Sequence, residues 1–217
     1  MLKVKEIGVD LRQILSIPQV YTFWQKLIGD YKLRKIYCRD YIKAKENDRI
    51  LDIGCGPANM VEFLPRNIDY VRFDDSSEYI NNAKKKYPNS ETSGNYAFFH
   101  ERVNFAQNFD EKFGKKFDII MANAILHHVD DKEAEKLISF AAANLKENGF
   151  FITHDGCFVE NQSFVKKWLL ESDRGKFVRT KDDYFKLFSK YFKNIKVSIR
   201  EDLYNIPYTI IIFECGN

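Results

Sequence analysis

The sequence predicts an α/β fold in which a doubly wound, mostly parallel sheet is covered by helices on both faces. Two observations support this prediction. Short apolar runs alternate with stretches in which apolar residues recur at helical spacing, which is typical of strands joined by helices. The predicted strands are themselves apolar, as expected when both faces of a parallel sheet are buried.

Length and composition fit one folded domain. The 217 residues suffice for one good-sized core, and a composition that is 45% hydrophobic and 30% charged excludes a disordered chain. The sequence has no internal repeat and no low-complexity linker. We expect a single domain over residues 1–217, with a helical cap at 1–45 and an α/β core at 46–217. The core includes a lid-like insert near 157–180.

The N-terminal cap is expected to be helical. Apolar side chains recur at helical spacing in residues 17–28 and again in 31–42, and Gly29 between them is a natural helix stop. The aromatic residues of the first segment are expected to pack the cap onto the core. Among them, Tyr21 is a candidate for lining the mouth of a substrate site.

Seven strands, four helices and a helix-rich insert are expected in the core. The strands are residues 49–54, 69–74, 96–103, 117–124, 150–156, 194–201 and 208–215. The helices are residues 57–65, 76–87, 130–149 and 180–192, and a helix-rich insert runs through residues 163–177.

Start and stop signals support three of these helices. Ser76 or Ser77 can cap the helix at 76–87. Asp130 with Glu133, and Thr180 with Asp183, have the spacing of a capping box, and Gly149 fits just beyond the end of the helix that Asp130 begins.

A turn rich in glycine follows the first strand. Ligands of open α/β sheets bind beyond the carboxyl ends of the strands, and Gly54 and Gly56 allow a ligand to approach the main chain closely there. Asp52 adds a negative charge beside this turn. Asp74 ends the second strand, where a carboxylate can accept both hydroxyls of a ribose. The pattern therefore predicts a nucleoside-containing ligand.

Two cofactors are compatible with such a turn. The dinucleotide fingerprint needs a third glycine, but Asn59 stands at that position. A pyrophosphate also disfavours an acid such as Asp52, whereas a cationic amine and a sulfonium favour it. These features favour S-adenosylmethionine over a nicotinamide cofactor.

At this point the sequence resembles the class I S-adenosylmethionine-dependent methyltransferases. Residues 50–59 (ILDIGCGPAN) resemble their first motif, and residues 70–80 (YVRFDDSSEYI) the motif of the second strand. Residues 117–129 (FDIIMANAILHHV) and 145–156 (LKENGFFITHDG) resemble the segments of strands four and five. The resemblance implies a seven-stranded Rossmann-like methyltransferase fold with strand order 3-2-1-4-5-7-6 and a final antiparallel hairpin.

The resemblance also implies which residues bind the donor. Asp52, Gly54 and Gly56 would face the methionine part, with Cys55 contributing its backbone, and Asp74 would hold the ribose.

Further donor contacts follow from the same resemblance. Asp75 and Ser76 would lie near the adenine, and Asn123 and Ala124 would line the methyl-transfer site. Many relatives hold the adenine amine with an acid after the third strand, and Glu101 is the residue available here.

Two histidines follow the fourth strand. His127 or His128 can accept a proton from a substrate hydroxyl; alternatively, both hold the loop by hydrogen bonds or flank the cofactor. With Asp130 and Asp131 they also supply metal-ligand types. Because Asp130 is needed as a helix cap and adjacent histidines point in different directions, we expect no metal.

Four further residues are candidates for substrate contacts. His154 and Asp155 end strand five, which opens to the same site. Arg174 and Arg179 can clamp an anionic group, because a guanidinium matches a carboxylate or phosphate, although surface ion pairs explain them almost as well.

These observations predict a methyltransferase for a small-molecule acceptor. In-line displacement on a sulfonium needs alignment and exclusion of water but no protein nucleophile, and the sequence offers no convincing catalytic triad. We expect an oxygen acceptor, with nitrogen and carbon left open. A nicotinamide-dependent oxidoreductase and a catalytically silent S-adenosylmethionine-binding module are the alternatives.

Charge and cysteine content bear on partners and location. The net charge of +3 is small and the charges are interspersed, which disfavours nucleic acid as a partner. Four widely spaced cysteines fit reduced thiols. No apolar segment resembles a signal peptide or a membrane span, so we expect a cytoplasmic protein without a membrane partner. The sequence carries no signal for its oligomeric state.

Overall fold

The computed structural model describes residues 29–74, 76–87, 95–100, 116–173 and 175–216. Its centre is an eight-stranded sheet with the order β3-β2-β1-β4-β5-β8-β7, in which β6 pairs with β5 off this path. Without the two-residue β6, this order is the 3-2-1-4-5-7-6 arrangement that the resemblance implies. The prediction of a Rossmann-like methyltransferase fold is confirmed.

The strands agree closely with the predicted runs. They are β1 (Arg49–Ile53), β2 (Asp69–Asp74), β3 (Asn95–His100), β4 (Phe117–Met121), β5 (Leu145–Phe158), β6 (Arg179–Thr180), β7 (Asn194–Arg200) and β8 (Ile210–Gly216). The pairs among β1 to β5 are parallel, whereas β8 runs antiparallel to both β5 and β7.

Helices connect these strands. The α-helices are α3 (Asp30–Tyr37), α4 (Ser77–Lys86), α6 (Asp131–Asn144), α7 (Phe164–Glu171) and α8 (Lys181–Phe188). One turn of π-helix, η1 (Cys38–Ile42), continues α3, and η2 (Asn59–Phe63) and η3 (Leu126–His128) are 3₁₀ helices.

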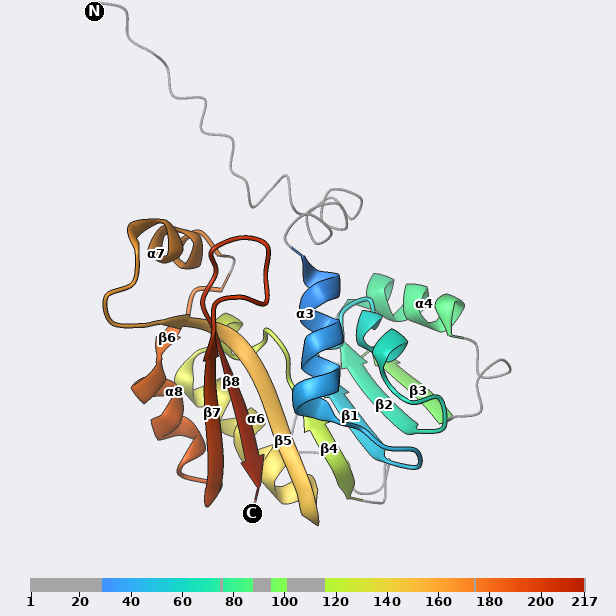
Figure 1. The fold of residues 1–217 in the computed structure, drawn as a ribbon. Coiled ribbons are helices and arrows are strands. Elements are labelled where there is room, and N and C mark those ends of the chain that lie inside the picture. The colour runs from blue at the N-terminus through green and yellow to red at the C-terminus, as the bar shows by residue number, and fades with distance from the viewer. Residues whose placement is uncertain (1–28, 75, 88–94, 101–115, 174, 217) are drawn as a thin grey trace, which may run out of the picture.

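The sheet separates two hydrophobic clusters. Apolar side chains of α6 and α8 pack on one face against alternate residues of β1, such as Leu51 and Ile53. On the opposite face of the sheet, α3, η1 and η2 pack against strand residues that point the other way, such as Ile50 of β1. Figure 1 shows α3 in front of the sheet and α6 behind it. Burial on both faces explains why the strands are apolar throughout.

The predicted helix caps are confirmed. The side chains of Ser76, Asp130 and Thr180 accept hydrogen bonds from the backbone N–H groups three residues on, at the starts of α4, α6 and α8. These caps satisfy donors that a helix start would otherwise leave unpaired. They therefore fix where each helix leaves the carboxyl edge of the sheet.

Three predicted helical segments differ in the structure. In the insert at 163–177, α7 already ends at Glu171. The helix expected over residues 57–65 is only the short η2, because Ala58 has a left-handed backbone with φ 59° that interrupts helical geometry. Helix α6 ends at Asn144, before the predicted stop at Gly149. Gly149 lies within β5, where a Cβ atom would come within 2.8 Å of the Phe117 carbonyl oxygen, so this glycine permits close strand packing instead.

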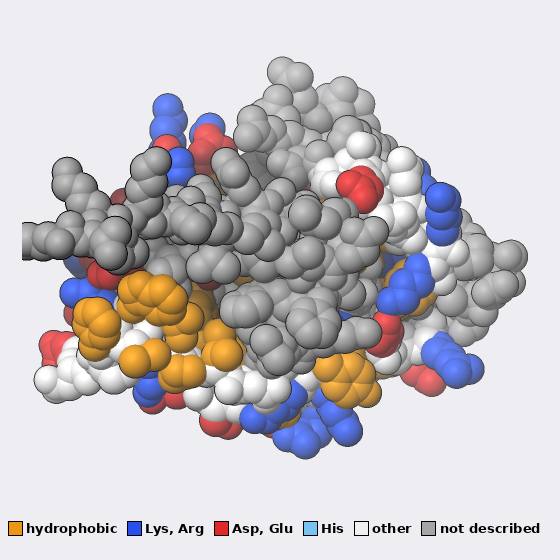
Figure 2. Space-filling model, turned by 90° about the horizontal axis from the view of Figure 1, so that it is seen from above, with side chains coloured by type: hydrophobic (Ala, Val, Ile, Leu, Met, Phe, Trp, Pro, Cys, Tyr) orange, Lys and Arg blue, Asp and Glu red, His pale blue; other side chains and the backbone are white. Residues whose placement is uncertain are grey.

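The insert between β5 and α8 rises above the carboxyl edge of the sheet (Figure 1). Apolar side chains gather on the surface seen from above this edge (Figure 2), and those of α7 are among the most exposed: Phe164, Val165 and Trp168. The predicted helix at 17–28 lies outside the described residues. None of the described helices has the length and hydrophobicity needed to cross a membrane.

Candidate active site

The glycine turn after β1 is held by the end of β2. The backbone N–H groups of Gly54 and Cys55 donate to the carbonyl oxygen of Phe73 at 2.9 and 3.0 Å. The next N–H group, that of Gly56, donates to Oδ2 of Asp74 at 2.7 Å. The turn and the acid at the end of β2 therefore form one unit, which we call the β1–β2 cradle (residues 52–56 and Asp74).

The two glycines of the cradle serve different purposes. Both have left-handed backbones, with φ 68° at Gly54 and φ 53° at Gly56. A Cβ atom on Gly54 would lie 2.3 Å from Cδ1 of Ile125, whereas one on Gly56 would meet nothing within 4 Å. Gly54 therefore allows close packing against the loop after β4, and Gly56 leaves open space above bare backbone.

Asp74 is buried and already accepts two backbone hydrogen bonds. Oδ2 accepts from Gly56 and Oδ1 from the N–H of Ser76 at 2.9 Å. Both oxygens of the carboxylate therefore help to hold the turn and the start of α4. The carboxylate of Asp74 thus lies beside the open space at Gly56.

Asp52 is buried beneath the turn. Burial raises its pKa to about 7, although the hydrogen bond from the Tyr70 hydroxyl at 2.5 Å and the charge of Arg72 oppose this shift. Arg72 is fully buried, pairs in register with Asp52 and stacks over the Tyr70 ring at 4.8 Å. Tyr70 and Arg72 are not among the residues that the sequence patterns predict for the site. The signal that could have pointed to them is an arginine within an otherwise apolar strand.

The side chain of Cys55 is not an activated nucleophile. Burial raises the pKa of its thiol well above the ordinary range, and the charge of Asp52 raises it further. A neutral thiol is a poor nucleophile, which agrees with a contribution through backbone only.

Asn123 follows β4 and contacts residues from two other elements. Its Oδ1 accepts from the Tyr37 hydroxyl at 2.8 Å and lies 3.1 Å from Nδ1 of His154. Burial lowers the pKa of His154 to about 4, so its imidazole is neutral at physiological pH. The N–H of Ala124, whose backbone is left-handed with φ 55°, donates to the His154 carbonyl oxygen at 2.8 Å. The ends of β4 and β5 are thereby joined.

His127 lies between two carboxylates. Its backbone N–H and Nδ1 both contact Oδ1 of Asp155, at 3.1 and 2.8 Å, and its Nε2 lies 3.5 Å from Oδ1 of Asp173. Burial opposes a charge on the imidazole, but the two carboxylates outweigh burial and raise the pKa of His127 to about 9. A protonated imidazole has no lone pair for a substrate proton, so in this state His127 links the carboxylates and does not act as a base.

Asp173 belongs to the insert and is held on both oxygens. Oδ1 accepts from the N–H of Gly175 at 2.9 Å and Oδ2 from the Tyr208 hydroxyl at 2.8 Å. We name Asn123, His127, His154, Asp155 and Asp173 the β4–β5 network. Asp173 was not predicted, because 46 residues separate it from His127 and nothing in its local sequence shows that they meet.

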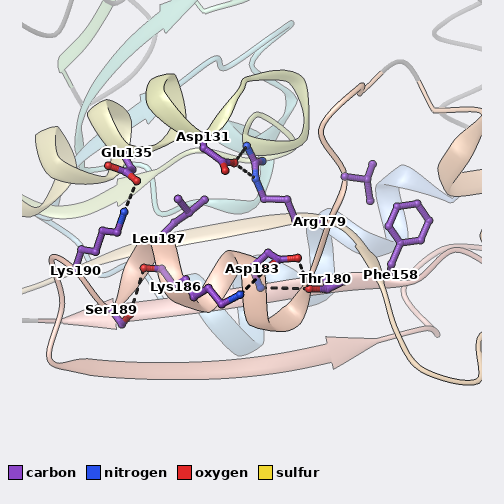
Figure 3. Close-up of a pocket in the computed structure, with 11 residues that line it drawn as sticks. Asp131, Glu135, Phe158, Arg179, Thr180, Asp183, Lys186, Leu187, Ser189 and Lys190 are labelled. Atoms are coloured by element: carbon purple, nitrogen blue, oxygen red, sulfur yellow. Dashed lines mark hydrogen bonds and ion pairs between the residues drawn. The ribbon is translucent and has the colours of Figure 1, made fainter.

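Arg179 does not offer its guanidinium to a substrate. All five of its N–H donors have partners: Nε and Nη2 contact Asp131, and the remaining hydrogen bonds go to the carbonyl oxygens of Leu126, Val129 and Phe177. Figure 3 shows its guanidinium directed at Asp131 on the wall of a cavity of about 620 Å³ between α6 and α8. Its bonds to Leu126 and Val129 hold η3 in place, which is a positioning role.

The remaining predicted residues fall into two groups. Ser76 lies beside Asp74, and His128 is exposed with its ring 4.2 Å from that of His127. Four residues lie outside the described part of the chain: Tyr21, Asp75, Glu101 and Arg174.

The sheet order and the β1–β2 cradle together define the class of this protein, the class I methyltransferases. A profile of the family described as "Methyltransferase domain" matches residues 25–191. The chain belongs to this family. No curated protein sequence matches the chain.

Solved structures with the same fold cover nearly the whole chain. A TehB-like SAM-dependent methyltransferase from Corynebacterium glutamicum is 13% identical with TM-score 0.60, covering 96% of this chain and 98% of that chain. A S-adenosylmethionine-dependent methyltransferase from Clostridium acetobutylicum is 15% identical with TM-score 0.64, covering 92% and 98%. Magnesium protoporphyrin IX methyltransferase from Synechocystis, solved with bound SAH, is 16% identical with TM-score 0.60, covering 100% and 90%. At these identities the likeness concerns the fold.

Proposed function

We propose that this enzyme binds S-adenosylmethionine in the β1–β2 cradle and transfers its methyl group to an oxygen of a small-molecule acceptor. The observation that carries the proposal is the hydrogen bond from Gly56 to Asp74, which places a buried carboxylate beside bare backbone and open space. A donor with a ribose and a cationic amine fits this combination, with Asp74 holding the ribose and Asp52 facing the amine. Asp75, Ser76 and Glu101 would surround the adenine.

The β4–β5 network would orient the acceptor beside the donor's sulfonium, which supplies the electrophilic methyl group. Asn123 and Ala124 would line the transfer site, and His154 would hold Asn123 in place. Oδ2 of Asp155 is buried without a hydrogen-bond partner among the described residues, which supports a contact to a donor group of the acceptor. Tyr21 and Arg174 would add substrate contacts from the cap and the insert.

An oxygen acceptor must lose a proton during transfer. His128 is the exposed imidazole of the pair, so it is the better candidate for accepting that proton, while His127 bridges its two carboxylates. A small-molecule acceptor is supported by the balanced charge of the chain and by the porphyrin named for one structural relative. All four cysteines are free thiols, which supports a cytoplasmic location.

Calorimetry with S-adenosylhomocysteine tests the donor site. The wild type is expected to bind, and Asp74→Ala to bind at least ~10-fold more weakly, because hydrogen bonds to a carboxylate contribute about 1.5–3 kcal/mol. Asp69→Ala is the matched control, since it removes a carboxylate from the other end of β2. Equal binding by the wild type and Asp74→Ala would refute the donor site.

Transfer of a labelled methyl group separates the proposed function from its alternatives. Tritium from S-adenosylmethionine should appear in a product when small hydroxylated acceptors are supplied. A silent binding module would bind S-adenosylhomocysteine yet transfer no label to any acceptor. A nicotinamide-dependent oxidoreductase would bind no S-adenosylhomocysteine and would instead change the absorbance of a reduced nicotinamide cofactor.

A further inference from the structure

Three side chains with metal-ligand atoms converge beside the β4–β5 network. His127, His128 and Asp173 each offer one ligand atom, and these atoms all lie within 4.8 Å of one another. The expectation of no metal assumed that adjacent histidines diverge. In η3 they do not, because the two rings lie 4.2 Å apart at an angle of 40°.

His127 is oriented as metal-binding histidines are. Asp155 contacts its Nδ1, so its Nε2 is directed toward Asp173. In metal sites a carboxylate on one ring nitrogen typically fixes the tautomer that presents the other nitrogen to the metal. Asp155 therefore has the position of an outer partner that prepares His127 as a ligand.

Asp173 is equally well fixed. The N–H of Gly175 and the hydroxyl of Tyr208 hold its two oxygens. A Cβ atom on Gly175 would lie 2.0 Å from Cδ2 of His127, so only glycine allows this segment to approach the imidazole. Side chains held this rigidly lose little conformational freedom when they bind an ion.

The spacing of the ligand atoms matches a coordination sphere. Two ligands bound at ~2.1 Å with tetrahedral geometry lie roughly 3.4 Å apart. The distance from Nε2 of His127 to Oδ1 of Asp173 is 3.5 Å. A zinc-sized ion can therefore be accommodated between these two atoms with little movement of either side chain, and it replaces the proton on Nε2 of His127, which is released to solvent.

We propose that His127, His128 and Asp173 bind one divalent first-row transition-metal ion. Two imidazoles and one carboxylate favour Zn²⁺, Fe²⁺, Co²⁺ or Mn²⁺, whereas Mg²⁺ and Ca²⁺ prefer oxygen ligands alone. With the ion bound, His128 is a ligand and the role of proton acceptor proposed above applies only to the metal-free chain. Three protein ligands leave at least one coordination position for water or a ligand oxygen. The ion would also join η3 to the insert and so stabilise their contact.

Titration with metal alone tests this inference. Protein freed of metal by a chelator is titrated calorimetrically with ZnCl₂, and separately with CoCl₂ while visible absorption is recorded. We expect one Zn²⁺ per chain, a cobalt spectrum typical of fewer than six ligands, and a higher Tm with Zn²⁺ because the ion binds only the folded chain. No donor or acceptor is present, so the result is independent of the proposed function.

Variants assign the site. His128→Ala alters an exposed side chain and is expected to fold and to lose at least ~10-fold in Zn²⁺ affinity, as is Asp173→Asn. Asp155→Asn should weaken binding by ~10–100-fold through the orientation of His127. Asp182→Asn, an exposed carboxylate at the start of α8, is the matched control and should bind as the wild type does.

Two results would overturn the proposal. One is a wild type that binds no Zn²⁺ and shows no cobalt spectrum. The other is binding that His128→Ala and Asp173→Asn leave unchanged, because the ion would then be held elsewhere in the chain.

Discussion

The β1–β2 cradle and the β4–β5 network lie at the same edge of one sheet but are built differently. Backbone N–H groups within a few residues of the strand ends hold the cradle together, as in the bond from Gly56 to Asp74. Side chains from distant parts of the sequence hold the network together, as in the contact of buried His127 with half-buried Asp173. In the proposed function, donor recognition would thus depend on local geometry, whereas acceptor recognition would depend on long-range packing.

The largest difference is expected between two of the buried aspartates, Asp155 and Asp52. Asp155→Asn removes a charge partner of His127 and should lower the free energy of unfolding by about 3–5 kcal/mol, the typical cost of breaking a buried ion pair. Asp52→Asn keeps an oxygen that can accept the hydrogen bond from Tyr70. This variant should change the free energy of unfolding by less than about 1 kcal/mol.

Urea unfolding of both variants at pH 7, without metal, measures this difference. The comparison holds if Asp155→Asn shifts the midpoint far more than Asp52→Asn at similar m-values. Equal shifts of the two midpoints would mean that the stability of the network depends on ion pairing no more than that of the cradle does.

A smaller difference is expected between the two glycines of the cradle. Gly54→Ala and Gly56→Ala both place a side chain on a left-handed backbone, but only Gly54→Ala meets Ile125. We expect Gly54→Ala to be about 1–3 kcal/mol less stable than Gly56→Ala in urea unfolding, the usual cost of overpacking.

The double variant Gly54→Ala with Ile125→Ala should recover part of that loss, because it removes the atoms that a new Cβ would meet. If the stability losses of the two single variants simply add in the double variant, the strained backbone at residue 54 alone would explain the loss caused by Gly54→Ala.

The smallest effect concerns pH. The pKa of Asp52 is raised to about 7, so the folded chain holds a proton that the unfolded chain releases above pH ~4. Stability from Asp52 is therefore fully present below pH ~4 and is lost as the pH rises to about 7. Since the donor's cationic amine favours the ionised carboxyl, affinity for S-adenosylhomocysteine should rise by up to ~10-fold per pH unit below 7 and then level off.

Calorimetry between pH 5.5 and 8.5 (roughly one to two units either side of the Asp52 midpoint) checks this prediction. Asp52→Asn should bind with an affinity that is flat over the same range. A wild type with the same flat profile would show that Asp52 does not face the amine.

The sequence was sufficient where a residue acts close to its own place in the chain. Asp74 ends β2 as predicted, and Ser76, Asp130 and Thr180 cap the helices that their local patterns indicate. The sheet order followed from the resemblance, because four motifs in the right order fix how the strands connect.

The sequence was insufficient where a residue's role depends on a distant partner. Gly149 resembles a helix stop, yet it is needed because β4 passes close to it. Arg179 resembles an anion clamp, yet three backbone carbonyl oxygens and Asp131 occupy its donors. Tyr37 reaches Asn123 across 86 residues, and no periodicity encodes such a contact.

The outermost strand, β7, has a consequence for how copies of this chain behave in concentrated solution. Among the described strands it pairs only with β8, so its other side has backbone groups on which a second sheet can grow. Lys196, paired with Glu214 across the hairpin, and Arg200 place charges on this strand. Such charges discourage fusion of two sheets, so neutralising them should favour fibrous aggregates over dispersed protein.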